Sequence, residues 1–179
     1  MEKDQIITAN LIRTIDELDS YRDLKQAANF LIRNICVSAS WSYGEAWMRD
    51  IKINQMTWLT YWGTSKDIYK RFTKLSALCK FGKGVGLIGR VWEQQKLLWI
   101  NDLKSDFNFL RTEAAELIGF NSAFGVPIFY KDDVILVLTF FLSNVKNEDV
   151  EISNILFNHS KKIGDKLSKL GVILKDDAK

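Results

Sequence analysis

The sequence predicts a single α+β domain built around an antiparallel sheet, and three observations support this. The chain has 179 residues, 47% of them hydrophobic, which is enough for one well-buried core and too little for two typical domains. Apolar residues recur at helical spacing near both ends, whereas the middle contains runs rich in aromatic and β-branched residues. The two strongest of these runs are joined by the short polar turn 131–133, which is typical of a hairpin.

The N-terminal region predicts two consecutive helices or one bent helix. A first apolar series with helical spacing predicts a helix over residues 2–20 and consists of Ile7, Leu11, Ile15 and Leu18. A second series follows Ser20 and Tyr21 and consists of Leu24, Ala28, Leu31 and Ile35.

The central region predicts strands separated by short helices. Residues 43–49 and 55–62 form an antiparallel hairpin or meander with a polar link at 50–54. Further along the chain we expect helices at 66–75, 87–95 and 110–118 and strands at 77–81, 97–100, 123–130 and 134–142. Apolar residues occupy both alternating sets of the last two strands, which predicts central strands covered on both faces. Pro127 inside such a strand indicates a bulge or an unpaired edge.

The C-terminal region predicts a helix over residues 147–174 that begins with the acidic sequence Asn147-Glu148-Asp149. Its apolar residues recur in steps of three and four, close to a coiled-coil stripe. Two interpretations remain open, and they are compatible if each uses one face: the helix packs on its own sheet, or it forms a dimer seam. The residues predicted for a dimer interface are Leu11, Ile15, Leu18, Ile152, Leu156, His159, Ile163, Leu167 and Leu170.

Composition and charge exclude several classes of protein. The net charge is only +3 with both signs interspersed, so no basic stripe for nucleic acid is expected. No segment approaches the roughly 20 apolar residues of a membrane span and no signal region opens the chain, which predicts a cytoplasmic protein without a membrane partner. Cys36 and Cys79 lie in apolar segments and are expected to be reduced, buried thiols rather than part of a disulfide or a metal site.

The spacing Gly84-x-Gly86-x-x-Gly89 matches a dinucleotide-binding fingerprint. Neighbouring hairpins argue against that fold, because it needs right-handed parallel crossovers. We interpret the glycines as a tight turn that permits close backbone approach, although amides at the start of the following helix could hold an anionic group of a ligand. His159, the single histidine, is interpreted as a core or interface residue because no ligand-spaced partner flanks it.

Several short motifs occur in an order that resembles a GAF domain. They are Gly44-Glu45-Ala46-Trp47, the turn 82–86, Gly89-Arg90-Val91-Trp92-Glu93, Trp99-Ile100-Asn101-Asp102 and Val126-Pro127-Ile128. The chain is most similar to GAF modules of bacterial, especially cyanobacterial, multidomain sensors. The resemblance implies one GAF domain over 1–179, with a core at about 24–146, a profilin- or PAS-like sheet of about six antiparallel strands, and helices on both faces. The terminal helices 2–20 and 147–174 would pack together on one face, and a ligand pocket would lie on the other.

Departures from specialised GAF branches narrow the expected function. Residues 106–119 contain neither the cysteine nor the histidine with which phytochrome-like members attach a bilin, so no covalent cofactor is expected. Free methionine sulfoxide reductases share a Gly-Lys-Gly-Val turn but need cysteines after it, where this chain has Gly86 and Leu87. No catalytic residue is therefore predicted.

The sequence thus predicts a non-catalytic sensory or regulatory GAF domain that binds a small molecule, dimerises, or does both, and transmits a signal through its terminal helices. The expected partners are a second copy, a small-molecule ligand, and a downstream signalling protein or fused output domain. The predicted pocket residues are Phe107, Leu110, Arg111, Phe124, Leu87 and Trp92, with Arg111 as the anion contact. A volume filled by Trp and Phe side chains would contradict this pocket. The alternatives are a ligand-free interaction or dimerisation module and a small redox enzyme of the free methionine sulfoxide reductase type.

Overall fold

The computed structural model describes residues 2–171, with side chains from residue 5 onward, and contains one six-stranded antiparallel sheet in the order β3-β2-β1-β6-β5-β4. The strands are β1 (Tyr43–Asp50), β2 (Gln55–Gly63), β3 (Lys80–Phe81), β4 (Leu98–Ile100), β5 (Ser122–Tyr130) and β6 (Asp133–Leu142). The helices are α1 (Glu2–Glu17), η1 (Leu18–Ser20), α2 (Leu24–Ala39), α3 (Lys66–Leu78), α4 (Gly86–Gln94), α5 (Thr112–Glu116), α6 (Asn147–Asn158) and α7 (Ser160–Ser168). None of the described helices is long and apolar enough to cross a membrane.

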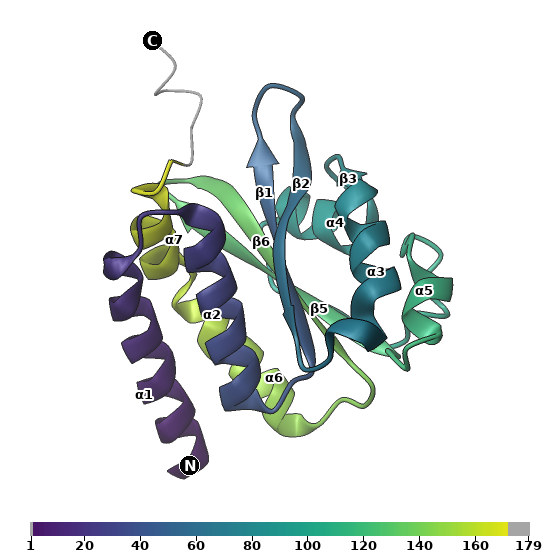
Figure 1. Ribbon diagram of the computed structural model, residues 1–179, viewed down its shortest axis with the longest axis horizontal. Coiled ribbons are helices and arrows are strands. Elements are labelled where there is room, and N and C mark those ends of the chain that lie inside the picture. The colour runs from purple at the N-terminus through teal and green to yellow at the C-terminus, as the bar shows by residue number, and fades with distance from the viewer. Residues whose placement is uncertain (1, 172–179) are drawn as a thin grey trace.

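Helices cover both faces of the sheet, as the resemblance implied. In Figure 1, α1, α2, α6 and α7 lie on one side of the sheet, and α3, α4 and α5 lie on the other. Each face therefore has its own hydrophobic cluster, one under α2 and α7 and one under α3 and α4. We call these the terminal-helix face and the α3–α5 face.

The central strands are buried as predicted, and Pro127 lies where its missing N–H is tolerated. Strand β6 pairs with β1 and β5, and all but the first of its residues are buried. On its other side β5 pairs with β4 only over 123–125, so Pro127 lies beyond the end of that neighbour. The adjacent register shift at Ile128 and Phe129 adds a bulge.

The C-terminal helix is broken, which corrects the prediction of one continuous helix over 147–174. The break lies at His159, whose backbone (φ −97°, ψ 2°) separates α6 from α7. The redirected α7 packs directly on β5, and a Cβ at Gly164 would lie only 1.8 Å from the carbonyl oxygen of Phe129. A larger residue at 164 is thus incompatible with this approach. The last predicted residues, 172–174, lie outside the described residues.

The apolar stripe of the terminal helices packs within one copy of the chain. Of the nine predicted interface residues, His159 and Leu170 are half-buried, and the buried others belong to the core of the terminal-helix face: Leu11, Ile15, Leu18, Ile152, Leu156, Ile163 and Leu167. A second copy cannot contact them unless the helices separate. Ion pairs of Lys162 with Asp16 and of Lys166 with Asp19 also join α7 to the N-terminal helices. Of the two interpretations left open, the structure has the packing of these helices on their own sheet.

Candidate functional site

A buried ion pair lies at the centre of the α3–α5 face. The two-residue period of β1 places Tyr43, Glu45 and Trp47 on this face. The Arg111 Nη1 group, from the residue that precedes α5, donates to both carboxylate oxygens of Glu45 at 2.8 and 3.1 Å. Both side chains are fully enclosed, with exposed fractions of 1% and 0%.

Further hydrogen bonds fix this pair. Arg111 Nη1 also donates to the hydroxyl of Ser76 at 2.6 Å. Glu45 accepts from the Tyr43 hydroxyl at 2.9 Å and from the Trp47 indole N–H at 3.2 Å. Burial, followed by the nearby charge of Glu45, holds the pKa of Tyr43 well above its ordinary value, so this phenol stays protonated and remains a donor.

Aromatic rings fill the space around the guanidinium group. Five ring centroids lie within 4.7 to 6.0 Å of Arg111 Cζ, and they belong to Phe72, Trp47, Phe141, Phe109 and Phe81. Arg111 Nε and Nη2 have no hydrogen-bond partner and face this apolar, cation–π environment. Arg111 is therefore neutralised by Glu45 from within the chain, which corrects the prediction that it contacts a ligand anion.

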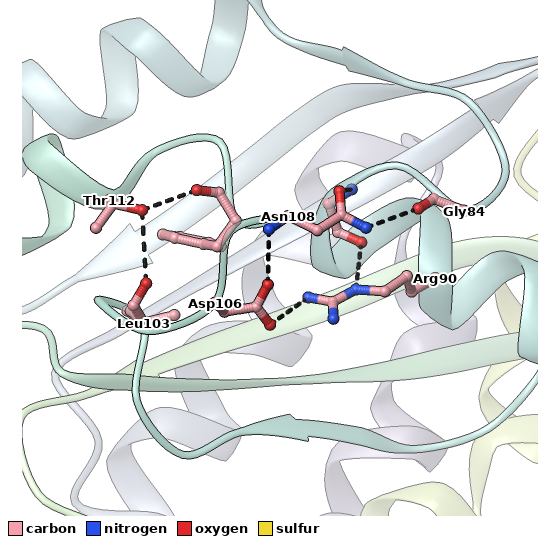
Figure 2. Close-up of polar contacts among 8 residues, drawn as sticks. Gly84, Arg90, Leu103, Asp106, Asn108 and Thr112 are labelled. Carbon is pink, nitrogen blue, oxygen red and sulfur yellow. Dashed lines mark hydrogen bonds and ion pairs between the residues drawn. The ribbon is translucent and has the colours of Figure 1, made fainter.

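Side-chain hydrogen bonds hold the segment before α5 in place next to the aromatic cluster around Arg111. Figure 2 shows these hydrogen bonds. The Asn108 side chain accepts from the Gly86 amide at 2.9 Å and donates to the Gly84 carbonyl at 3.0 Å. Arg90 donates to the Asp106 carboxylate at 2.7 Å, and the other oxygen of that carboxylate accepts from the backbone N–H of Asn108. Thr112 donates to the carbonyl of Phe109 at 2.8 Å. We call residues 103–112 the cover segment.

The glycine-rich turn holds the cover segment instead of a phosphate group. A Cβ at Gly89 would lie 2.0 Å from the Gly82 carbonyl oxygen, so the last glycine of the spacing permits close backbone approach, as we interpreted it. The Gly86 amide at the start of α4 binds Asn108. This corrects the expectation that this amide is exposed for an anionic ligand.

The predicted pocket residues do not line one cavity. Leu87 and Trp92 are residues of α4 whose side chains are buried in the core of the α3–α5 face. Phe124 lies on the opposite face of the sheet, stacked with Trp99 and Phe140 at centroid distances of 4.5 and 5.1 Å. Phe107 is 100% exposed. The alternation of β5 explains the error at Phe124, because neighbouring strand residues point to opposite faces.

Leu110 and Arg111 instead border an open groove between α3 and α5. This groove has a volume of about 410 Å³, and its lining includes Arg71, Leu75, Leu110, Glu113 and Leu117. Of the buried ion pair, Arg111 is among the lining residues of this groove and Glu45 is not.

The two cysteines lie on different faces of the sheet. Cys36 is buried in the core of the terminal-helix face, whereas Cys79 ends α3 and packs against the other core. Burial raises the pKa of both thiols above the ordinary value. Among the residues from 5 to 171 there is no group of three or more His, Cys, Asp or Glu side chains placed to hold a metal ion.

Sequence analysis missed the partners of Arg111. Glu45 enters the sequence analysis only as part of a family motif. Its carboxylate lies in a buried strand, with Tyr43 two residues before it and Trp47 two residues after it, and such a buried carboxylate signals an internal cation. No local signal identified Ser76 or Asn108, since their partners lie 35 and 22 residues away in the chain.

An antiparallel sheet in this strand order, with terminal helices on one face and a glycine-turn helix on the other, defines a small α+β domain. The chain belongs to the GAF domain family, whose model matches residues 22–159. No curated protein matches at a significant level.

Solved structures share the fold at low sequence identity. The free methionine-R-sulfoxide reductase of Neisseria meningitidis, solved with its substrate, matches with a TM-score of 0.75 and 13% identity over 95% of this chain and 93% of that one. The GAF domain of an Acinetobacter phosphoenolpyruvate-protein phosphotransferase matches with a TM-score of 0.71 and 13% identity over 92% and 94%. The A. aeolicus nlh2 GAF domain, in an inactive state, matches with a TM-score of 0.70 and 15% identity over 92% and 99%.

Proposed function

We propose that this chain is a non-catalytic regulatory GAF domain that acts through contacts with other proteins rather than by enclosing a small molecule. One observation carries the proposal: the Arg111–Glu45 pair and its five aromatic neighbours occupy the α3–α5 face, where the sequence predicts a ligand pocket. A ligand entering there would have to displace aromatic side chains and leave a buried ion pair less well enclosed. The alternative of a ligand-free interaction module thereby becomes the preferred function.

A reductase activity is the alternative that structural relatives bring forward, and cysteine chemistry argues against it. The thiolate is the reactive form of cysteine. Cys36 and Cys79 both have raised pKa values and lie on different faces of the sheet, so they form neither an activated nucleophile nor a nucleophile and resolving pair.

Dimerisation through the terminal helices remains part of the proposal. The proposed contact surface differs from the dimer seam that the sequence predicts. Ile6 and Ile12 on the outer side of α1 are 56% and 37% exposed, and the exposed Ala9 lies between them. We expect light scattering to give the mass of a dimer for the unchanged chain and the mass of a monomer for Ile12→Glu. A variant with the same mass as the unchanged chain would remove this dimer from the proposal.

Native mass spectrometry of the protein purified from its natural host, beside a denatured control, tests whether the domain encloses a small molecule. The expected spectrum has no mass excess over the polypeptide. A non-covalent adduct that disappears on denaturation, and is lost in Phe109→Ala but kept in the surface variant Asn101→Ala, would overturn the proposal.

An assay with free methionine sulfoxide and a thiol reductant tests the enzymatic alternative. We expect no turnover above the rate of the Cys36→Ser/Cys79→Ser double variant. Turnover that the double variant lacks would establish a redox enzyme instead.

A further inference from the structure

Two apolar walls face each other across the groove between α3 and α5. On α3, three exposed side chains recur at positions that share one flank of the helix, and they are Ile68 (56% exposed), Leu75 (38%) and Leu78 (82%). On the other wall, Leu110 and Leu117 are 60% and 66% exposed. Leu75, Leu110 and Leu117 line the groove directly. Gathered exposed leucines of this kind mark interaction surfaces more often than isolated exposed ones do.

The α3 wall of the groove is also positively charged. Arg71 lines the groove, and the exposed Lys70 and Lys74 lie on the neighbouring surface of the same helix. Within the part of the chain that the structure describes, none of these three cations has an ion-pair partner. Glu113 is the acidic residue on the opposite wall, so the charge across the groove is asymmetric.

The residue pattern on the α3 side of the groove suits a helix. The α3 residues that line the groove are Arg71 and Leu75, and the exposed Ile68 and Leu78 extend the apolar side of this helix beyond the groove at both ends. An amphipathic helix laid in such a groove inserts apolar side chains at positions i, i+3 or i+4, and i+7. Acidic residues on its flank toward α3 would meet Lys70, Arg71 and Lys74.

We propose that the groove between α3 and α5 is the docking site for an acidic amphipathic helix of a partner protein. A concave groove with leucines on both walls favours a helix over a lipid surface, which would need the apolar side chains to protrude together from one plane. This inference rests on the proposed function as an interaction module and names its partner by chemistry.

Selection from a displayed library of 16-residue helical peptides on the full chain tests the proposal. We expect enriched peptides to have leucine or phenylalanine at the groove-facing positions and Asp or Glu on one flank. The affinity of a synthesised winner should fall about tenfold or more in Leu117→Glu and in Leu75→Glu, as expected when a central apolar contact is lost. It should fall severalfold in Lys74→Glu and weaken with added salt.

The matched control is Val37→Glu, which introduces the same charge at a residue that is 60% exposed on α2, across the sheet from the groove. It should bind like the unchanged protein, and all variants should have the same circular dichroism melting curve. Amide shifts in the labelled protein should be confined to α3 and residues 110–117.

Other outcomes overturn the proposal. They are the absence of enriched peptides, a basic consensus, and binding that Leu117→Glu and Lys74→Glu leave unchanged. Binding to vesicles of phosphatidylcholine and phosphatidylglycerol that the same two variants abolish would assign the surface to a membrane. A dimer that Leu117→Glu dissociates would assign it to a second copy. A small molecule retained in native mass spectrometry would contradict the proposed function but not the docking site. The peptide-binding result would still decide the docking site.

Discussion

The Arg111–Glu45 pair is the residue-scale feature that distinguishes this domain. Each partner is buried, and removal of one leaves an uncompensated charge inside the aromatic cluster. The pair itself is weak evidence for stability, since the desolvation of both groups offsets much of their attraction. Its effect is specificity: it fixes where the cover segment meets β1.

A mutant cycle tests this account. Arg111→Met should lower the free energy of unfolding by about 3–5 kcal/mol, because Glu45 is then buried without its cation. Addition of Glu45→Gln should recover part of that loss, so that the double variant is more stable than the sum of the single effects predicts. Urea denaturation monitored by tryptophan fluorescence measures each value. Additive losses would contradict a coupled pair.

Buried groups that must stay neutral predict a loss of stability at alkaline pH. Burial raises the pKa of the Cys36 thiol above 9.0 and that of the Tyr43 phenol above 10.0, so the unfolded chain releases these protons first. Their contribution is therefore fully present below about pH 9 and is lost as pH rises further, at up to about 1.4 kcal/mol per pH unit for each group. Urea denaturation at pH 7, 9 and 10 under reducing conditions should show this loss. A Cys36→Ala variant should lose less between pH 9 and pH 10 than the unchanged chain, and equal losses would exclude the thiol as a source.

At the scale of elements, the cover segment is a loop whose conformation depends on a few side chains. It contains little regular structure, and its position depends on Asn108, Asp106 and Thr112 (Figure 2). Loops with few backbone hydrogen bonds open at lower cost than sheets. This segment is therefore where the α3–α5 face would open first.

Asn108→Ala removes two hydrogen bonds to the glycine turn and should accelerate amide hydrogen exchange across 103–112. We expect a loss of about 1–3 kcal/mol in the free energy of unfolding, because the Gly86 amide loses its acceptor. Hydrogen exchange with mass spectrometry locates the change. The exposed neighbour Asn101→Ala is the control, and equal exchange in both variants would show that Asn108 does not hold the segment.

At the scale of the whole molecule, the N-terminal helix is part of the core. Ile7, Leu11, Ile15 and Leu18 are each at most 7% exposed and pack against α2, α6 and α7. If the terminal helices instead lay outside the domain and packed against a second copy, these residues would be exposed in the monomer.

Deletion of residues 1–20 separates these two arrangements. Loss of four buried side chains, each contributing about 1.5–3 kcal/mol as an upper estimate, should strongly lower the melting temperature and increase binding of a hydrophobic dye. A truncated chain that melts like the unchanged protein, but changes from dimer to monomer, would favour the seam over the core.

Sequence reasoning was most successful where the pattern is local. The hairpin of β5 and β6, the helical N-terminal region and the GAF order of motifs follow from period, turn chemistry and short motifs. It was less successful where packing overrides a pattern. The stripe from Ile152 to Leu170 has the same spacing whether it packs on a sheet or on another chain, and the structure has two helices, ending at Asn158 and beginning again at Ser160, where the stripe predicts one.

The sequence by itself determined the fold class and the GAF family, because these depend on composition, periodicity and motif order. Only the tertiary structure decided the content of the α3–α5 face. Arg111 and Glu45 are 66 residues apart, and no local pattern states whether a cation meets a ligand or an anion of its own chain. That choice depends on which side chains the folded sheet and cover segment bring within hydrogen-bonding distance, and here they bring Glu45.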